Sequence, residues 1–236
     1  MRSILSSMKV TTLVESLPPS YIREKEGDLM SELTAFFSGE PTELIASKLL
    51  GKTLRYQTNQ GVMSGYITEA EAYLGQNDSA AHAFQGKRTP SNEALYRDPG
   101  TIYIYSIHGR YMFDIATQEA GVPQGILVRG LEPVDGIELM RQNRSREGYE
   151  LTNGPGKLMQ ALGIQDKSLN LISLDEAPLT IQLTGKITAK VGESARIGVS
   201  QNGNGTLLPL RYFVAGNPYV SGMRKHEMDL ENRGWK

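Results

Sequence analysis

The sequence predicts an α+β protein, a single domain built on a mainly antiparallel, curved sheet with short helices. Three observations lead to this fold class. Segments with the two-residue alternation of strands outnumber segments with helical periodicity. The 25 glycines are spread through the chain, which favours many turns and short strands over a helical bundle. Strands and helices do not alternate regularly, as a parallel sheet would require.

The composition is that of an ordinary globular protein, with 39% apolar and 22% charged residues in 236. The absence of cysteine excludes disulfides, a thiol nucleophile and cysteine-based metal sites. No apolar run approaches the roughly 18 residues of a membrane span, and the first 20 residues read poorly as a signal peptide. The net charge of −1 does not indicate a nucleic-acid binder, so positive charge for such a partner must be local. We therefore expect a cytoplasmic protein with no membrane contact.

The chain begins with an extension, residues 1–38, of unknown role. One short helix is predicted in it, around "LMSELTAFF". The organised domain is expected to span residues 39–236. It starts with "PTELIASKLL", which has helix-start chemistry and apolar residues at helical spacing, and Gly51 follows as a stop.

The next segment, "GYITEAEAY", alternates like a strand. One face would carry Ile67, Glu69, Glu71 and Tyr73, and the other Tyr66, Thr68, Ala70 and Ala72. Spacing alone favours two acids that point at water from a half-buried strand, because exposed carboxylates are common and active sites are rare. A functional carboxylate is the alternative, and for Glu69 the solvated or structural role remains favoured.

Residues 78–100 are loop-rich, with one helical turn expected at "SAAHAF". "TIYIYSIHGRYMFDIAT" then reads as a β-hairpin whose tight turn is His108-Gly109. Histidine adopts positive φ more readily than most residues, which suits this position. The hairpin tip would protrude and carry an aromatic ring.

The second half of the chain continues the α+β pattern. "QGILVRGLEPVDG" predicts a buried strand, "IELMRQNRS" a helix, and "TNGPGKLMQALGI" a glycine-proline turn that begins a short helix. The segments "LTIQLTGKI", "ARIGV" and "LRYFVAG" predict further strands.

Several of these fragments occur in a specific order. They are "TEAEAYLG", a histidine nine residues beyond Tyr73, "PGTIYIYSIHG", "LVRGLEP", "GPGKLMQALGI", "ARIGV" and "LRYFVAGNP". In this order, over about residues 40–222, the chain resembles the 3-methyladenine (alkyladenine) DNA glycosylase family. The resemblance implies base-excision repair: a damaged purine is flipped out of duplex DNA and its N-glycosidic bond is hydrolysed. The expected substrates are N-alkylated purines, with deaminated purines such as hypoxanthine second.

The resemblance also implies the partners of the reaction. Double-stranded DNA with damaged purines is the partner, the protein acts as a DNA-associated monomer, and neither cofactor nor metal is needed. No lysine lies in the pocket segments, so we expect a monofunctional glycosylase that does not cut the strand.

The resemblance assigns three residues to catalysis. Glu71 would activate the attacking water, and Arg129 would lie beside that water and a backbone phosphate. The main-chain carbonyl of Ile197 would hold the water. Without the resemblance, Arg129 reads as one half of a buried ion pair, with Glu132 as the candidate partner.

Three aromatic residues match the family positions that sandwich the flipped base: Tyr73, His82 and Tyr105. At the hairpin tip the family commonly carries an intercalating tyrosine, and this chain has His108 there. The nearest match to a family asparagine that screens purines is Asp114, after a one-residue shift. An ionised carboxylate accepts hydrogen bonds and donates none. Five basic residues are expected on the DNA backbone: Lys87, Arg88, Arg110, Lys157 and Arg211.

Two other functions would account for part of this sequence. A metal-dependent hydrolase would draw its ligands from His82, His108, Glu69 and Glu71, but these residues match no common zinc motif. Activity that persists in chelator would dispose of that reading. A non-catalytic nucleic-acid binding module would explain the hairpin and the basic residues, yet it gives no reason for Glu71 beside Tyr73.

Overall fold

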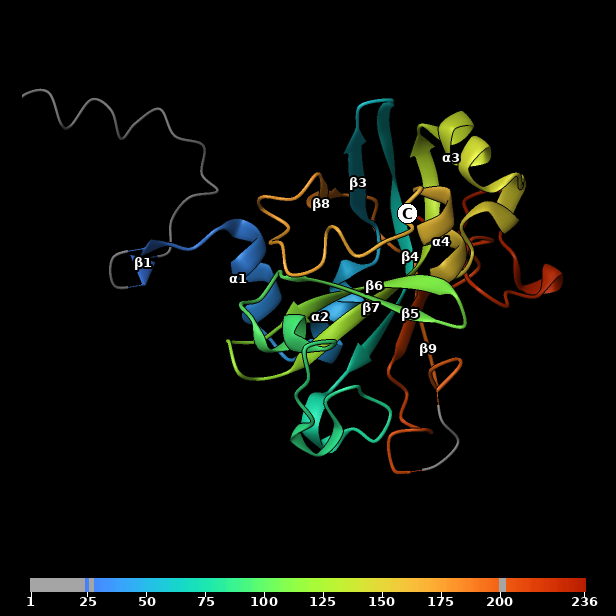
Figure 1. Ribbon diagram of the computed structural model, residues 1–236. Coiled ribbons are helices and arrows are strands. Elements are labelled where there is room, and N and C mark those ends of the chain that lie inside the picture. The colour runs from blue at the N-terminus through green and yellow to red at the C-terminus, as the bar shows by residue number, and fades with distance from the viewer. Residues whose placement is uncertain (1–23, 26–27, 200–202) are drawn as a thin grey trace, which may run out of the picture.

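The computed structural model describes residues 24–25, 28–199 and 203–236. Its main sheet is antiparallel throughout, in the order β5-β6-β7-β4-β10-β9, with β3 on β4 and β8 on β3 (Figure 1). The strands are β3 Lys52–Thr58, β4 Gly61–Tyr73, β5 Ile102–Ile107, β6 Arg110–Thr117, β7 Gln124–Asp135, β8 Leu179–Gly185, β9 Val191–Ser194 and β10 Arg211–Val214. A separate two-stranded sheet pairs β1 Glu24–Lys25 with β2 Asp28–Leu29.

The helices are short. They are α1 Glu32–Ser38, α2 Thr42–Leu49, α3 Ile137–Arg144 and α4 Pro155–Ala161, with 3₁₀ turns η1 Gly75–Asn77, η2 Phe84–Gly86, η3 Glu93–Tyr96, η4 Gly148–Leu151 and η5 Lys225–Glu227. In Figure 1, α1 and α2 lie to the left of β4, and α3 and α4 lie to its right. The α+β prediction is therefore confirmed, and no helix in the described part of the chain is long and apolar enough to cross a membrane.

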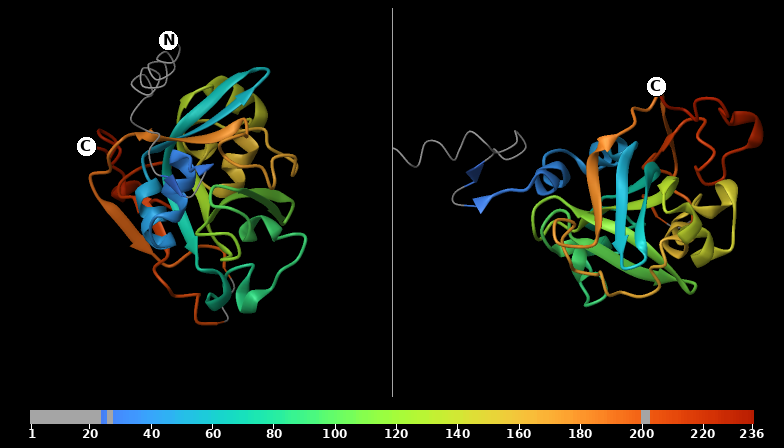
Figure 2. Two further views of the ribbon diagram at one scale, coloured as in Figure 1. Left: turned by 90° about the vertical axis from the view of Figure 1, so that its left-hand side faces the viewer. Right: turned by 90° about the horizontal axis from the view of Figure 1, so that it is seen from above.

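The core lies between these helices and one face of the sheet. Ile45 and Leu49 of α2 and Leu158 of α4 are buried in the same cluster as Ala70 and Ala72 of β4. Small side chains on β4 let the helices approach the sheet closely. Figure 2 shows β8, β3 and β4 side by side when the molecule is seen from above.

Helix α1 belongs to the same core. Its N-cap Ser31 accepts a hydrogen bond from the Thr34 N–H, and its Phe37 side chain is fully buried. Most of the 1–38 extension, including residues 1–23, lies outside the described residues. Because Phe37 packs with residues beyond position 39, we propose that the folded domain includes α1.

Three register shifts interrupt the pairing of β4 with β7, and two of them are bulges on either side of Glu69. Ile67 pairs with Leu131 and Glu69 with Gly130, which leaves Thr68 unpaired; Ala70 then pairs with Val128, which leaves Arg129 unpaired. The bulges change the predicted faces of β4, because Ile67 packs in the core with Ala70 and Ala72 instead of sharing the Glu69 face. Bulges re-aim side chains and are frequent beside active sites. Here they bring Arg129 to the two glutamates.

The predicted hairpin is confirmed. Ile107 pairs with Arg110, and His108 and Gly109 both have positive φ, 49° and 73°, as a two-residue type I′ turn requires. The prediction of a strand at "ARIGV" is wrong, since β9 ends at Ser194 and residues 195–199 are irregular. The Ile197 N–H donates to a side chain instead of a neighbouring strand. "SAAHAF" forms turns that lead into η2.

Candidate active site

One row of paired residues crosses six strands on the face opposite the helices. From β5 to β9 it runs Tyr103, Asp114, Leu127, Glu71, Arg211 and Ser194. Directly paired residues share a face, and neighbouring strands lie about 4.8 Å apart. The carboxyl groups of Asp114 and Glu71 therefore face the same side of the sheet, on strands roughly 10 Å apart, with Leu127 between them.

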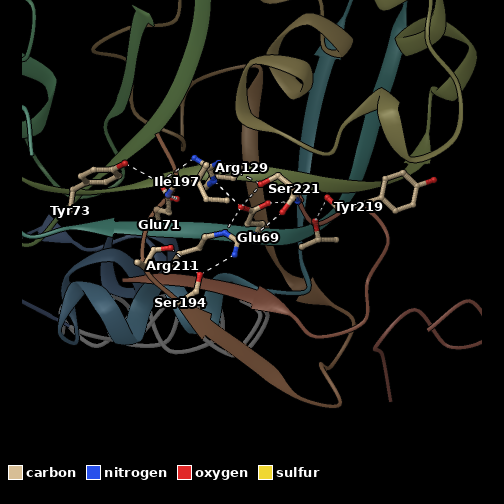
Figure 3. A network of polar contacts seen from close by, with 11 residues as sticks. Glu69, Glu71, Tyr73, Arg129, Ser194, Ile197, Arg211, Tyr219 and Ser221 are labelled. Atoms are coloured by element: carbon tan, nitrogen blue, oxygen red, sulfur yellow. Dashed lines mark hydrogen bonds and ion pairs between the residues drawn. The ribbon is translucent and has the colours of Figure 1, made fainter. Parts of the chain in front are cut away.

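Glu71 is fully buried and its carboxylate has three partners. Oε2 accepts hydrogen bonds from the Tyr73 hydroxyl at 2.9 Å and from Arg129 Nη1 at 3.2 Å, and Oε1 accepts one from the Ile197 N–H at 2.8 Å (Figure 3). Burial raises the pKa of Glu71, and these three donors act against the rise. The result is a carboxylate with a fixed direction and more basicity than one in water.

Glu69, two residues earlier, lies in a different environment. Its Oε1 accepts hydrogen bonds from Arg129 Nε at 2.8 Å, Arg211 Nε at 2.7 Å and Ser221 Oγ at 2.7 Å, and Oε2 accepts from the Ser221 N–H at 2.7 Å. Burial alone would raise its pKa, but the two guanidiniums and the hydrogen bonds hold that pKa below the ordinary value. Glu69 is neither water-facing nor free to take a proton. It fixes Arg129, whose predicted pairing with Glu132 does not occur.

A glycine makes this arrangement possible. A Cβ on Gly130 would lie 2.6 Å from Thr68 Oγ1 and 2.7 Å from the Tyr219 carbonyl oxygen. Only glycine lets the 219–221 segment approach β7 this closely. The approach brings Ser221 to Glu69 (Figure 3).

His82, Tyr103 and Tyr105 form an aromatic wall on the outer face of the hairpin. The His82 and Tyr105 rings meet edge to face at 4.6 Å, and Tyr103 and Tyr105 stack at 4.8 Å. His82 Nδ1 lies 2.8 Å from the Tyr103 hydroxyl, and partial burial and the nearby Lys87 lower the pKa of His82. The wall borders a cavity of about 780 Å³, whose rim includes Lys87 and Lys167. Glu71 does not line this cavity, because its own partners cover it.

Asp114 lies behind this wall with an unsatisfied carboxyl oxygen. Its Oδ1 is buried and has no hydrogen-bond partner among the described residues. Burial raises the pKa of Asp114 to about 8, with Glu71 adding to the rise and Tyr105 and Arg129 opposing it. Asp114 is therefore mainly a neutral carboxylic acid at pH 7, able to donate a hydrogen bond.

Sequence reasoning missed a second buried ion pair beside the site. Arg196 donates to both carboxylate oxygens of Asp78, at 2.5 and 2.7 Å, and to the carbonyls of Ala72 and Gly205. Its guanidinium also lies 4.5 Å from the centre of the Tyr73 ring. Arg196 thus fixes the neighbouring Ile197 against β4. The sequence feature that could have indicated this ion pair is the arginine directly before Ile197 in "ARIGV".

On the activity that the resemblance implies, we expect Arg196→Lys to lower the base-release rate without weakening DNA binding. Lysine keeps the charge but loses the two-pronged contact with Asp78, so the Ile197 N–H moves relative to Glu71. Misplacement on the scale of 1 Å at a reacting group costs up to about 100-fold in rate. Single-turnover release and duplex affinity measure the two effects, with Arg55→Lys on β3 as the control. A loss of affinity equal to the loss of rate would refute this positioning role.

The predicted DNA-contacting residues occupy different environments. Lys87 and Arg110 are exposed, and neither side chain makes a hydrogen bond or ion pair with a described residue. Arg88 pairs with Glu93 at 2.8 Å and Lys157 with Glu150 at 2.7 Å, both near the surface. Arg211 is buried, and its three nitrogens donate to Glu69, Ser194 and the Ser221 carbonyl. We therefore do not retain Arg211 as a phosphate contact.

His108 is exposed at the hairpin tip, as predicted. The hypothetical metal ligands do not converge, since no three histidine, aspartate or glutamate side chains in residues 24–25, 28–199 and 203–236 are grouped to hold an ion. The carboxylate oxygens of Glu69 and Glu71 instead accept hydrogen bonds from N–H and O–H donors.

A protruding hairpin, an aromatic wall and a buried carboxylate beside them are features expected of DNA glycosylases that act on extrahelical bases. The sequence model of the family described as "Methylpurine-DNA glycosylase (MPG)" matches residues 35–218. The chain therefore belongs to the methylpurine-DNA glycosylase family.

Curated relatives agree with this assignment. The chain is 49% identical over 203 residues to a protein of Latilactobacillus sakei, a match that covers 85% of this chain and 95% of that one. It is 48% identical over 207 residues to a protein of Lactiplantibacillus plantarum (87% and 99% covered) and 46% identical over 209 residues to one of Enterococcus faecalis (88% and 91% covered). All three carry the name "Putative 3-methyladenine DNA glycosylase".

Proposed function

We propose that this protein is a monofunctional DNA glycosylase that removes N-alkylated purines from duplex DNA with a water molecule activated by Glu71. One observation carries the proposal: the Glu71 carboxylate is buried, aimed by Arg129, Tyr73 and the Ile197 main chain, and has a raised pKa. A carboxylate in this state suits general-base work better than one that is exposed or fully neutralised.

In the proposed reaction, Glu71 takes a proton from water as the oxygen attacks C1′ of the deoxyribose. The bond between C1′ and N9 breaks, and its electron pair leaves with the purine. The ionised carboxylate also stabilises the positive charge that develops on the sugar. Arg129 holds this carboxylate in place and helps to keep it ionised.

The sugar reaches Glu71 only after one of the contacts that cover the carboxylate opens. Ile197 is 44% exposed and lies in an irregular segment, whereas Arg129 is buried in β7. We therefore propose that the exposed Ile197 side chain moves aside when DNA binds, while Arg196, held by Asp78, keeps the Ile197 N–H on Glu71. The Ile197 carbonyl then becomes free to hold the attacking water.

The aromatic wall suits a flipped purine. An alkylated ring is electron-poor and stacks well on aromatic faces, and a cationic ring gains cation–π attraction. His82 and Tyr105 supply one side, and Tyr73, whose other face contacts Arg196, supplies the side near Glu71. His108 would fill the gap that the flipped nucleotide leaves in the stack, with Lys87, Arg88, Arg110 and Lys157 near the phosphates.

We further propose that Asp114 delivers a proton to neutral purines such as hypoxanthine. Asp114 and Glu71 lie on the same face on either side of Leu127, and all three are buried. Once the covering side chains open, a purine above Leu127 would have an acid on one side and a base on the other. A neutral purine needs protonation to leave easily, whereas a cationic one does not. The Asp114 proton would move to a ring nitrogen of the purine while Glu71 accepts one from water.

Hypoxanthine release should therefore fall as the pH rises through about 8, where Asp114 loses its proton. The titratable and charged groups around Asp114 are Glu71, Arg129, Tyr73, Tyr103 and Tyr105. Asp114→Asn should lower this release by about 10²–10⁴-fold, because the amide donates a hydrogen bond but transfers no proton. Release of cationic 3-methyladenine should change much less. Single-turnover assays on both duplexes across pH 6–9.5 check this. An unchanged pH profile for hypoxanthine in the variant would contradict the role of Asp114.

The proposed function itself is tested by incubating wild-type protein with a methylated duplex. Free 3-methyladenine and an intact strand that breaks only after alkali treatment are the expected products. Strand cleavage without alkali would exclude a monofunctional enzyme. Loss of activity in a chelator, restored by added metal, would favour the metal-dependent hydrolase, and tight binding without release would favour a binding module.

A further inference from the structure

A groove of about 340 Å³ lies on the other side of the hairpin from the aromatic wall. It separates the start of β6 from the ends of α3 and α4; in Figure 1 the hairpin tip lies below α4. Its lining includes Arg110 and Tyr111 of β6, Arg144 and Ser145 at the end of α3, and Gln160 of α4. None of these except Arg110 was identified from the sequence.

The groove is lined by two arginines, Arg110 and Arg144, and by no acidic residue in the described part of the chain. Arg144 lies within electrostatic reach of Arg110 and Arg146, and its pKa is lowered by burial and then by these two cations. The acid that opposes them is Glu150, which already pairs with Lys157 at 2.7 Å. Like charges held together cost stability, so the cluster favours an anion.

The guanidiniums are positioned and still able to bind. Arg144 donates from Nη1 to Gln160 and from Nε to the Glu150 carbonyl, and no described residue accepts from its Nη2. A Cβ on Gly156 would lie 3.0 Å from Arg110 Cδ, so the Arg110 stem packs directly on the α4 backbone. Arg146 is exposed next to Ser145, and its one side-chain hydrogen bond to a described residue goes to the Ser145 carbonyl, at 3.1 Å.

The backbone at the groove is also unusual. Ser145 has φ of 47°, a left-handed conformation that glycine adopts more easily at the end of a helix. A strained non-glycine residue at a charged groove is the kind of outlier that accompanies ligand contacts. Ser145 lines the groove.

We infer that Arg110, Arg144, Arg146 and the Ser145 hydroxyl bind phosphates of the duplex backbone on the side of His108 opposite the base cavity. This inference rests on the proposed function, which supplies duplex DNA as the partner. Guanidiniums pair with phosphate oxygens through two parallel hydrogen bonds. With Lys87 on the other side of the hairpin, DNA would be held on both sides of the inserted tip. Contacts on both sides would oppose closure of the gap that the flipped nucleotide leaves in the base stack.

The test is the salt dependence of binding to a duplex with one stable abasic-site analogue. The logarithm of the association constant falls linearly with the logarithm of the salt concentration, and each lost phosphate contact should reduce the steepness of this line by about 0.9. The double variant Arg144→Gln/Arg146→Gln is therefore expected to lose about 1.8 from the slope and to bind at least 10-fold more weakly at 150 mM salt. Arg146→Gln alone should lose about half of that slope, and because Arg146 is exposed, misfolding cannot explain its effect.

Arg141→Gln is the matched control, because Arg141 lies on α3 and pairs with its neighbour Glu138. It should leave the slope unchanged. Slopes of both groove variants equal to that of Arg141→Gln would overturn the inference. Base release by the wild type at saturating enzyme reports separately on the proposed function. If the wild type shows the expected salt dependence but releases no base, the proposed chemistry is rejected. If the wild type releases base but the groove variants keep its slope, only the groove is rejected.

Discussion

Glu71→Gln is expected to abolish base release while leaving the fold and DNA binding intact. Glutamine has the same shape and still accepts hydrogen bonds from the Ile197 N–H or Arg129, but it cannot take a proton from water. Loss of a general base costs about 10²–10⁴-fold, and loss of the negative charge beside the developing sugar cation adds to this. Single-turnover release from 3-methyladenine and hypoxanthine duplexes should show the defect for both bases. A variant that releases both at the wild-type rate would show that Glu71 is not the base.

The pH dependence of the wild type gives an independent check on Glu71. Burial raises the pKa of Glu71 above its ordinary value, so the fraction in the active, ionised form falls as the pH drops through that raised pKa. Release of cationic purines should fall with it on the acid side. Glu193→Gln, an exposed glutamate on β9, is the matched control and should leave both the rate and the profile unchanged.

Local patterns predicted the fold class and several of its elements. Three patterns depend only on neighbours in sequence: the alternation in "GYITEAEAY", the two-residue turn at His108-Gly109 and the spacing of "PTELIASKLL". They form β4, the β5–β6 hairpin and α2, respectively. The same patterns brought Glu71 and Tyr73 to one face of β4. The resemblance supplied Arg129 and Ile197, and both contact Glu71 in the structure.

Pairing between distant segments could not be predicted in the same way. The bulges at Thr68 and Arg129 depend on the register of β4 against β7, and alternation alone placed Ile67 on the wrong face. The burial of Glu69 depends on Arg211 and Ser221, 142 and 152 residues away. The strand expected at "ARIGV" is absent because Arg196 is drawn to Asp78 in a loop 118 residues earlier.

Glu69→Gln should reduce stability more than any other substitution considered for this site. The buried Glu69 Oε1 is shared by Arg129 and Arg211, so a neutral residue leaves two guanidiniums close together without that charge. Removing one partner from a buried ion pair costs about 3–5 kcal/mol. For a chain of this size, each kcal/mol lowers Tm by roughly 2–4 °C.

Glu71→Gln is the matched control for this effect, because the two glutamates have opposite pKa shifts. The lowered pKa of Glu69 means that its ionised form stabilises the fold, and this contribution is lost as the pH falls through its folded pKa. The raised pKa of Glu71 means that ionisation costs stability above its ordinary pKa, so Glu71→Gln should be at least as stable as wild type at pH 7. Denaturant unfolding at pH 7 and pH 4 measures both. Equal losses from the two variants would contradict the division between a structural glutamate and a reactive one.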